Sequence, residues 1–544
     1  MKITVTAVVI ATIMFLFSTQ LSQFVNADNL GVYSGLSWVF YLSLGILISL
    51  LAWRIYTRRE SQTTNLAVIL LIQVFILAIG YLVGGIGASS SDSNGFLTYF
   101  GIVAYAAQHG LGSVFSSSAQ AGGWPSSTAF YSFLLEVTNL ASPQNAVQVV
   151  VISRVMFGTF DTLVIFLIVR KMYPETPFLP TYVSMFYIAG CFFIPAWFQD
   201  TSFAYTLFLL LSLLLIGFRQ KASIPIFLTM VATVLANFYA SVIVLGLVSA
   251  DFIITRNRRY LVAYLIFLGA WNFIGYPLLY YPSFGVYYLT HFFSLGFLAA
   301  KINGSLTQGS YSHHLVVLSQ LSLTLAFGAG AFASMLWLRV RGKRDMLPKP
   351  SKLIFYPILI AAIGSAAAAG FGVNPIEGLE RAYIFAVPFL LIILGAGFTR
   401  RSAPFLALLV ILLMPITIIT TYGGVTPVYF SNSNMQGGNY LQTHWADNTF
   451  LSLTFQASTP TGGGAFIFTE GYLVLHSYTL YLNSTQIPGL SHNGKPSMVG
   501  SLAHFLEVDS QIYGVSPQYL TLANALARSA NIIYSNPDTQ YYLI

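Results

Sequence analysis

The chain has 544 residues, of which 56% are hydrophobic and only 7% are charged, against about 25% in ordinary soluble domains. This composition excludes a soluble enzyme, and an aromatic content of 15% excludes a disordered chain. The formal net charge is +8, but the cations lie beside apolar runs, where they report topology rather than nucleic-acid binding. We therefore expect a protein whose main solvent is lipid, with no nucleic acid among its partners.

Apolar runs of about 16 to 24 residues, long enough to cross a hydrocarbon core of roughly 30 Å, recur along the chain up to residue 422. They predict a polytopic α-helical membrane protein with about thirteen transmembrane helices, at 4–22, 36–53, 66–86, 146–169, 179–197, 203–218, 222–236, 239–255, 260–279, 315–338, 353–371, 382–398 and 404–422. The seventh and eighth runs form one apolar stretch with cations at both ends. Two positive ends require an even number of crossings, so we expect a tight hairpin near Asn237.

The distribution of cations predicts the orientation. With a cytoplasmic N-terminus, 19 of the 24 Lys and Arg residues fall on the cytoplasmic side, as the positive-inside rule requires. These are Lys2, Arg54, Arg58, Arg59, Arg170, Lys171, Arg219, Lys221, Arg256, Arg258, Arg259, Arg339, Arg341, Lys343, Arg344, Lys349, Lys352, Arg400 and Arg401. We expect a multi-pass protein of the cell membrane, with its first run retained as an anchor. A cleaved signal peptide is the alternative.

Three parts of the chain are expected. Residues 1–65 hold two N-terminal transmembrane helices, 66–423 form a multi-span core, and 424–544 shift to Gly, Ser, Asn and Thr clusters with short β-like and helical runs. This tail predicts a small extracytoplasmic α/β domain. The core includes an outer loop, 87–145, whose weakly polar helical runs are expected to lie in the membrane interface. Alternatively, two of those runs cross the membrane as a pair.

Two outer aspartates are candidate catalytic residues. Asp92 follows the third run in a serine-rich segment, where its carboxylate could act as a general base toward an acceptor hydroxyl. Asp200 lies in the short turn WFQDTSF, where it could hold an acceptor or a cation. The sequence requires no cofactor, and a divalent cation, Mg²⁺ or Mn²⁺, held by Asp92 and Asp200 is an open alternative. The simpler interpretations are a solvated loop carboxylate for Asp92 and a helix cap for Asp200.

Two arginines are candidate ligands for a lipid phosphate. Arg154 and Asp161 are seven residues apart in the fourth run, so both should face the protein interior rather than lipid. A guanidinium in the outer half of this run could bind a phosphate bidentately, unless it forms a structural ion pair with a neighbouring helix. Arg381 follows Glu377 and Glu380 in a predicted short outer loop, where it could meet a phosphate headgroup or snorkel to the interface.

The order of these features resembles the C-type membrane glycosyltransferases, the GT-C superfamily. The resemblance covers roughly residues 66–422. It rests on the outer acid Asp92, the element WPSSTAFYSFLLEVTNL, the arginine-bearing run ISRVMFGTFDTLVIFLIVRKMYP, the turn FQDTSFAYTLFLLLSLLL and the late element GLERAYIFAVPFLLIILGAG. The chain differs from the family in having a lone Asp92 among serines rather than a paired-acid signature, in two additional N-terminal spans and in lacking a WWD-type element in its tail. These differences argue against an oligosaccharyltransferase.

The resemblance implies an inverting transfer of a sugar from a polyprenyl-phosphate donor to an extracytoplasmic glycan, lipid or protein. By position, Asp92 would be the base and Arg381 would contact the carrier phosphate. Arg154 or a divalent ion could add positive charge near that phosphate. The implied partners are the lipid-linked sugar donor, the glycan or glycoprotein acceptor and membrane lipid. The alternative is a non-catalytic envelope protein of the same fold, acting as a lipid-linked glycan transporter or a scaffold. A transporter would show repeats and polar residues near the membrane midplane.

Overall fold

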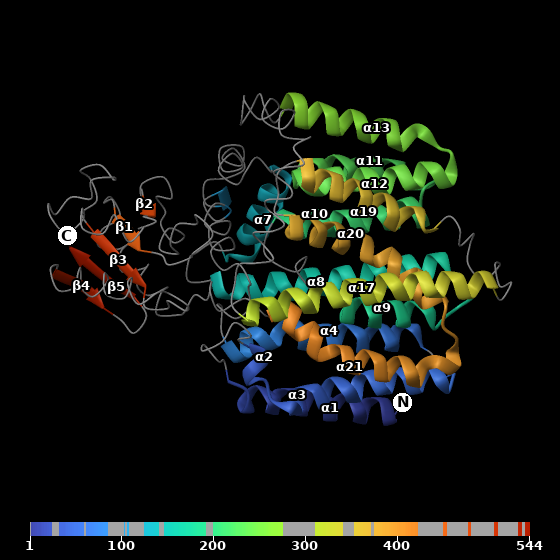
Figure 1. Cartoon of the computed structure of the whole chain (residues 1–544), viewed down its shortest axis with the longest axis horizontal. Coiled ribbons are helices and arrows are strands. Elements are labelled where there is room, and N and C mark those ends of the chain that lie inside the picture. The colour runs from blue at the N-terminus through green and yellow to red at the C-terminus, as the bar shows by residue number, and fades with distance from the viewer. Residues whose placement is uncertain are drawn as a thin grey trace.

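The computed structural model describes most of the chain up to residue 422 and five short pieces of the tail. The described residues are 2–23, 32–58, 61–84, 103, 106–107, 125–140, 146–191, 200–275, 311–340, 353–370, 375–422, 450–453, 477–479, 505–509, 531–535 and 539–543. The long helices lie side by side in one bundle, and the strands of the tail lie beyond one end of it (Figure 1).

Helices account for almost all of the described chain before residue 423. They are α1 (Lys2–Leu21), α2 (Val32–Gly35), α3 (Trp38–Tyr56), α4 (Gln62–Gly84), α7 (Pro125–Thr138), α8 (Ala146–Met172), α9 (Leu179–Gly190), α10 (Asp200–Gly217), α11 (Ser223–Val234), α12 (Phe238–Thr255), α13 (Arg258–Gly269), α17 (Tyr311–Val340), α19 (Phe355–Gly370), α20 (Pro375–Ala396) and α21 (Ala403–Tyr422). A π-helical turn, Ala270–Gly275, continues α13, and a 3₁₀ turn, Arg400–Ser402, precedes α21.

Eight helices in the described part are long and apolar enough to cross a membrane, as a polytopic helical membrane protein requires. Each predicted run overlaps a helix, but several of these helices are shorter than eighteen residues, so the count of thirteen crossings stays a prediction. Large apolar side chains are exposed on the sides of the bundle, among them Ile13, Leu325 and Leu412, each more than half exposed. Lipid is the solvent that suits such a surface, because the side chains are apolar and the backbone groups inside a helix are bonded to one another.

The expected hairpin near Asn237 is confirmed. Helix α11 ends at Val234 and α12 begins at Phe238. The side chain of Asn237 caps α12 by accepting a hydrogen bond from the backbone N–H of Ala240 at 2.9 Å. Asparagine is a favoured N-cap because its side chain replaces a backbone acceptor that the first turn of a helix lacks. The break in an otherwise continuous apolar stretch therefore has a local cause.

The start of α20 corrects one prediction. The sequence placed Glu377, Glu380 and Arg381 in an outer loop before a span at 382–398, but the helix already begins at Pro375. Proline suits the first turn of a helix because its ring fixes φ at a helical value and its missing N–H would be unpaired there anyway. Hydropathy detects only the apolar part of a helix, so it does not distinguish the polar first turns of α20 from a loop.

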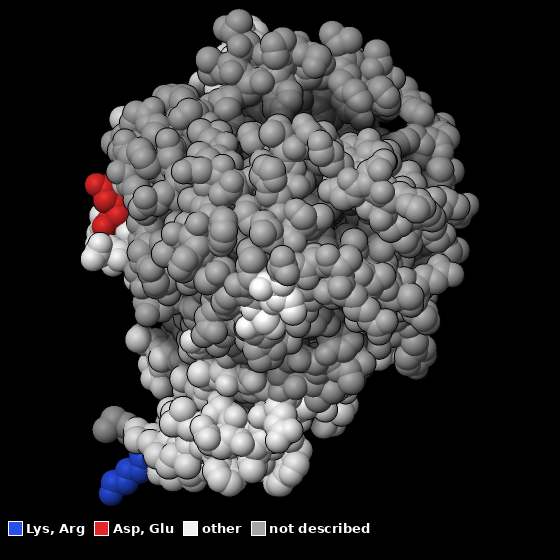
Figure 2. Space-filling model, turned by 90° about the vertical axis from the view of Figure 1, so that its left-hand side faces the viewer, with Lys and Arg blue, Asp and Glu red and all other residues white. Residues whose placement is uncertain are grey.

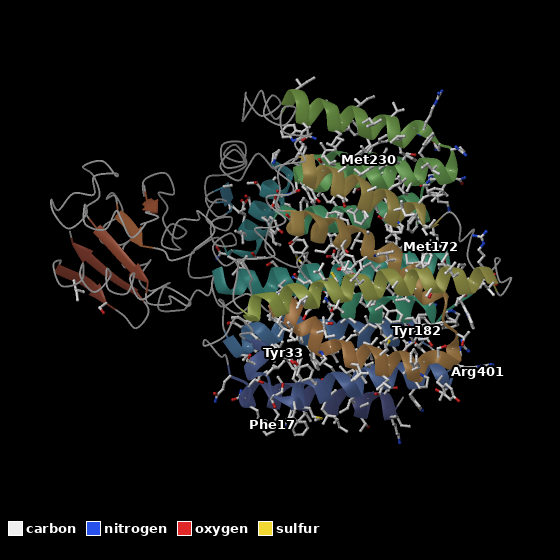
Figure 3. The ribbon with its side chains drawn as sticks, viewed as in Figure 1. Phe17, Tyr33, Met172, Tyr182, Met230 and Arg401 are labelled. Atoms are coloured by element: carbon white, nitrogen blue, oxygen red, sulfur yellow. The ribbon has the colours of Figure 1, made fainter. Side chains whose placement is uncertain are left out.

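Polar side chains join the helix ends at the side of the bundle away from the strands. Arg54 donates to Asn65 at 2.8 Å and to Thr4 at 3.1 Å, which links the end of α3 to the starts of α1 and α4. Asn65 in turn donates to Thr181 of α9, and Tyr182 donates to the backbone before α21. Figure 3 places Tyr182 toward this end of the bundle.

The cations of the described chain gather at the same end. Apart from the buried Arg154, each Lys or Arg with a described side chain lies at a helix end or in the turn that follows it. These residues are Lys2, Arg54, Arg58, Arg170, Lys171, Arg219, Lys221, Arg256, Arg258, Arg259, Arg339, Arg400 and Arg401. Figure 3 shows Arg401 at this end. On the opposite end face, the described residues visible in Figure 2 include few charged side chains.

The closest approach to a neighbouring helix backbone that the described glycines report joins α12 and α19. A Cβ atom added to Gly246 would lie 2.8 Å from the Cα of Ile360, which is backbone and cannot move aside. We expect Gly246→Val to force the two helices apart and to cost about 1–3 kcal/mol. Gly328→Ala is the matched control, because nothing lies within 4 Å of its added Cβ. Thermal denaturation in detergent, followed by gel filtration, checks this, and equal stability of the two variants would contradict it.

The described pieces of the tail form one five-stranded sheet. The strands are β1 (Phe450–Leu453), β2 (Ser477–Thr479), β3 (Phe505–Asp509), β4 (Asn531–Ser535) and β5 (Thr539–Leu543), in the order β2-β1-β3-β5-β4. β1 runs parallel to β2 and β3, and β5 is antiparallel to β3 and β4. The helical run expected at 520–530 lies outside the described residues, so the α/β domain at 424–544 stays a prediction.

Candidate functional site

A row of buried polar side chains follows one face of α8. Arg154 and Asp161 are 2% and 1% exposed, which confirms that both face the protein interior. At 1.5 Å per residue they lie about 12 Å and 22 Å from the start of α8 at Ala146. Asp161 is therefore near the middle of the helix, and Arg154 is nearer the end of the bundle from which α8 enters.

Arg154 lies against an aromatic ring but has no hydrogen-bond acceptor among the described residues. All three guanidinium nitrogens are buried and without a partner there. The guanidinium carbon is 4.8 Å from the ring centroid of Tyr422, the last residue of α21. The hydroxyl of Tyr422 donates to the carbonyl of Ile76 in α4, and its ring packs on Gly80, where a Cβ would overlap it. Gly80 thus lets Tyr422 support the guanidinium from one side.

The absence of an acceptor for Arg154 has an energetic consequence. A buried donor without a partner costs about 1–3 kcal/mol, and more when it is charged. A cation–π contact returns only about 0.5–2 kcal/mol. The alternative prediction, a structural ion pair with a neighbouring helix, is not found for Arg154 in the described ranges, where the salt bridge is that of Arg219 with Asp251. A guanidinium is planar and carries five N–H donors. Buried without an acceptor among the described residues, that of Arg154 is suited to binding an anion, above all a phosphate.

Asp161 lies among hydroxyl groups. Thr206 of α10 donates to its Oδ1 at 2.8 Å, while Oδ2 has no partner among the described residues. Tyr187 of α9 and Tyr205 of α10 lie within electrostatic range of the carboxyl group, and their hydroxyls are 3.4 Å apart. The site at Asp161 is thus polar but contains no described cation within hydrogen-bonding distance.

Gln73 of α4 lies between the two ionisable residues of α8. Its side chain is fully buried, and neither its amide nitrogen nor its oxygen has a partner in the described part of the chain. A Cβ added to Gly158 would lie 3.0 Å from the Gln73 amide nitrogen. Gly158 is four residues after Arg154 and three before Asp161, so it shares their face of the helix. Arg154, Gln73 and Asp161 therefore form one row, here called the α8 row.

Helix α7 packs against α8 and α10 near the outermost member of this row. Phe130 stacks on Phe203 of α10 with ring centroids 4.5 Å apart, and Tyr131 meets Phe157 of α8 edge-on at 5.7 Å. Phe157 is three residues from Arg154, and Phe203 is three residues from Asp200. Ser126 donates to the carbonyl of Ala232 near the end of α11. Figure 1 shows α7 at the end of the bundle nearer the strands.

Asp200 lies in the first turn of α10 rather than in the turn before it. Its half-buried carboxylate accepts a hydrogen bond from the Asn237 amide at 2.6 Å, and that amide also lies 3.5 Å from the Thr201 hydroxyl. A carboxylate at a helix N-terminus is stabilised by the helix dipole. The observed role of Asp200 is thus to tie α10 to the α11–α12 hairpin. Its catalytic role stays a prediction.

The backbone of Arg381 lies at the same level of the bundle as the start of α10. Tyr205 meets Phe385 at 5.2 Å, and Phe208 meets both Phe385 and Phe389, so α10 and α20 run in parallel. Arg381 is one turn before Phe385, and Thr201 is one turn before Tyr205. The sequence prediction that places Arg381 and Asp200 at one end of the bundle is therefore confirmed for their backbones.

Asp92 lies outside the described residues, in the stretch between Gly84, where α4 ends, and Val103. The prediction that it is the base is therefore untested. Among the described residues, no three His, Cys, Asp or Glu side chains lie together as metal ligands. The divalent-cation hypothesis for Asp92 and Asp200 stays a prediction.

Two members of the site were missed in the sequence. Gln73 is a lone amide within the apolar run LAVILLIQVFILAIGYLV, and a polar residue inside a span is itself a signal of function. Tyr422 ends the last apolar run, where a tyrosine is usually assigned to the interfacial belt. Its contact with Arg154 depends on how α21 packs and leaves no local signal in the sequence.

Comparisons of the chain with protein-family models, with curated proteins and with solved structures give no match.

Proposed function

We propose that the chain is an integral membrane glycosyltransferase that moves a sugar from a polyprenyl-phosphate donor to an extracytoplasmic acceptor. The observation that carries this proposal is the buried guanidinium of Arg154, which has no acceptor among the described residues. Arg154 is the third residue of the membrane-length part of α8, Ile152–Met172, which is where the phosphate of a lipid carrier would meet the edge of a hydrocarbon core. The resemblance to GT-C enzymes supports the same assignment.

The mechanism follows from the predicted roles. Asp92 accepts the proton of the acceptor hydroxyl, whose oxygen attacks the anomeric carbon of the sugar. The bond between that carbon and the phosphate oxygen breaks, and polyprenyl phosphate leaves. The configuration at the anomeric carbon is thereby inverted. Arg154 and Arg381 stabilise the negative charge that develops on the leaving phosphate. In this proposal Asp200 holds the end of α10 in place, and the tail positions the acceptor.

The topology belongs to the same proposal. Thirteen crossings with a cytoplasmic N-terminus place the 424–544 tail, Asp92 and Arg381 on the outer side of the cell membrane. The gathering of cations at the opposite end of the bundle supports this orientation, because Lys and Arg are enriched in cytoplasmic loops. A lipid-linked donor also accounts for the large membrane-embedded share of the chain.

A second candidate function is favoured by one observation. Asp161 and Gln73 are polar groups buried near the middle of the bundle, as a transporter of lipid-linked glycans would require. In this second function the chain would have the same fold but would move lipid-linked glycans without transferring a sugar. The two functions differ in one measurable respect, the formation of a new glycosidic bond.

Sugar transfer from a radiolabelled polyprenyl-phosphate sugar, in membranes that contain the wild type, Asp92→Asn or Arg381→Ala, tests the proposal. We expect Asp92→Asn to lose about 10²- to 10⁴-fold in rate, the usual contribution of a general base. We expect Arg381→Ala to bind the donor more weakly. Gel filtration in detergent controls for folding, and chelation followed by Mg²⁺ or Mn²⁺ tests the cation. Normal transfer by Asp92→Asn removes the base assignment, and no transfer by the wild type favours the transporter.

A further inference from the structure

We propose that Asp161 is a proton-binding site in the interior of the bundle, hydrated from the α7 end through Gln73 and Arg154. This proposal is independent of sugar transfer and concerns a group that the proposed mechanism does not use. It rests on burial and on missing hydrogen-bond partners along the α8 row.

The first step is the charge state of Asp161. The carboxyl group is 1% exposed and receives one hydrogen bond, from Thr206. The titratable groups within electrostatic range of it are Tyr187 of α9 and Tyr205 of α10, and these tyrosines in turn have Cys191, just after α9, and Tyr383 of α20 as neighbours. Among the described residues the nearest cation along α8 is Arg154, about 10 Å away along the helix axis. A carboxylate so placed in an apolar bundle is stable only when it is neutral or bound to a cation.

Asp251 provides the contrast within the same protein. It is also 1% exposed and lies in a membrane-length helix, but its carboxylate forms a salt bridge with Arg219. Its charge therefore has a partner, whereas Asp161 has no cation at that distance among the described residues. The two aspartates differ in pairing and not in burial, which makes Asp251 an internal control.

The second step is the path by which a proton reaches Asp161. The Gln73 amide is polar, buried and unpartnered among the described residues, and buried water satisfies amides of this kind. It lies between Asp161 and Arg154, whose guanidinium is nearer the α7 end of α8. In the other direction along α8, the hydroxyl of the buried Thr162 donates to the carbonyl of Gly158, and the buried side chains beyond it are apolar: Val164, Ile165, Phe166, Ile168 and Val169. Along α8, the unpartnered polar groups therefore extend from Asp161 toward the α7 end.

Carbodiimide labelling tests the proton on Asp161. Dicyclohexylcarbodiimide reacts with protonated carboxyl groups in apolar surroundings: the carboxyl oxygen bonds to the carbodiimide carbon and the proton moves to its nitrogen. We expect intact-mass spectrometry to find one adduct in the wild type and in Asp251→Asn, and none in Asp161→Asn. Labelling should fall as the pH rises and should not depend on whether Na⁺ or choline balances the chloride. Protection by Na⁺ would overturn the proposal in favour of a sodium site.

Infrared spectroscopy gives a second readout that needs no access for a reagent. The difference spectrum of wild type minus Asp161→Asn should contain the C=O stretch of a protonated carboxylic acid, and this band should shift when H₂O is replaced by D₂O. Gln73→Leu should slow the shift, because it removes the middle of the path. A carboxylate band in place of the acid band overturns the proton assignment. An unchanged exchange rate in Gln73→Leu overturns the path.

Discussion

Replacing Arg154 with methionine is expected to stabilise the ligand-free protein while weakening its interaction with the lipid donor. The wild-type guanidinium is buried without an acceptor in the described part of the chain, which costs about 1–3 kcal/mol. Methionine fills a similar volume with apolar atoms and removes this cost, although the contact with Tyr422 is lost. Charge-assisted hydrogen bonds to a phosphate contribute about 1.5–3 kcal/mol, so donor binding should weaken about 10- to 100-fold.

Thermal stability in detergent without lipid donor and the concentration dependence of sugar transfer measure the two effects separately. Arg154→Lys is the matched control: it keeps a positive charge but loses the bidentate fork, so transfer should fall between that of wild type and Arg154→Met. A loss of stability in ligand-free Arg154→Met would contradict the argument, since it would mean that the guanidinium has a structural partner.

Replacing Arg219 with methionine is expected to have the opposite effect on stability. Arg219 lies between α10 and α11 and forms a salt bridge with Asp251 of α12, which is 1% exposed. Burial lowers the pKa of the Arg219 guanidinium. Its positive charge and the negative charge of Asp251 are nevertheless paired with each other. Removing the arginine leaves a buried carboxylate alone, which costs about 3–5 kcal/mol. We expect the lower end of this range, because the Arg219 side chain is 23% exposed.

The double variant Arg219→Met/Asp251→Leu separates the loss of the pair from the isolated charge. It should recover most of the stability, because replacing both members of a buried ion pair with apolar residues is often neutral. Chemical unfolding in detergent measures all three variants against wild type. If Arg219→Met is as stable as wild type, the salt bridge contributes nothing to the fold.

The local features of this chain could be predicted well from its sequence. Membrane-length helices follow from runs of apolar residues, because the backbone groups in lipid must be bonded within the segment itself. The hairpin near Asn237 follows from the cations on both sides of one apolar stretch, and it is confirmed with Asn237 as the cap. The start of α20 at Pro375 was missed, because the polar first turns of a helix lie outside a hydropathy window.

The candidate site was only partly predictable. The inward direction of Arg154 and Asp161 follows from their spacing, since residues seven apart in a helix share a face. Their partners do not follow from spacing. Tyr422 reaches Arg154 from the last helix of the bundle, and Gln73 reaches Gly158 from α4. These contacts join helices that are distant in the chain, and hydropathy carries no information about which helices become neighbours.

Arg154 and Arg219 show which properties follow from the sequence and which depend on the packing of the helices. Composition and the positions of cations were enough to indicate a membrane protein with apolar helices flanked by cations. This is because each membrane-spanning segment must be apolar by itself, whichever helices surround it. Only the packing of the helices decided that Arg219 meets an aspartate and that Arg154 meets an aromatic ring. The energy of a buried charge depends on what surrounds it, so an arginine has an ion-pair partner at one position and no acceptor among the described residues at the other.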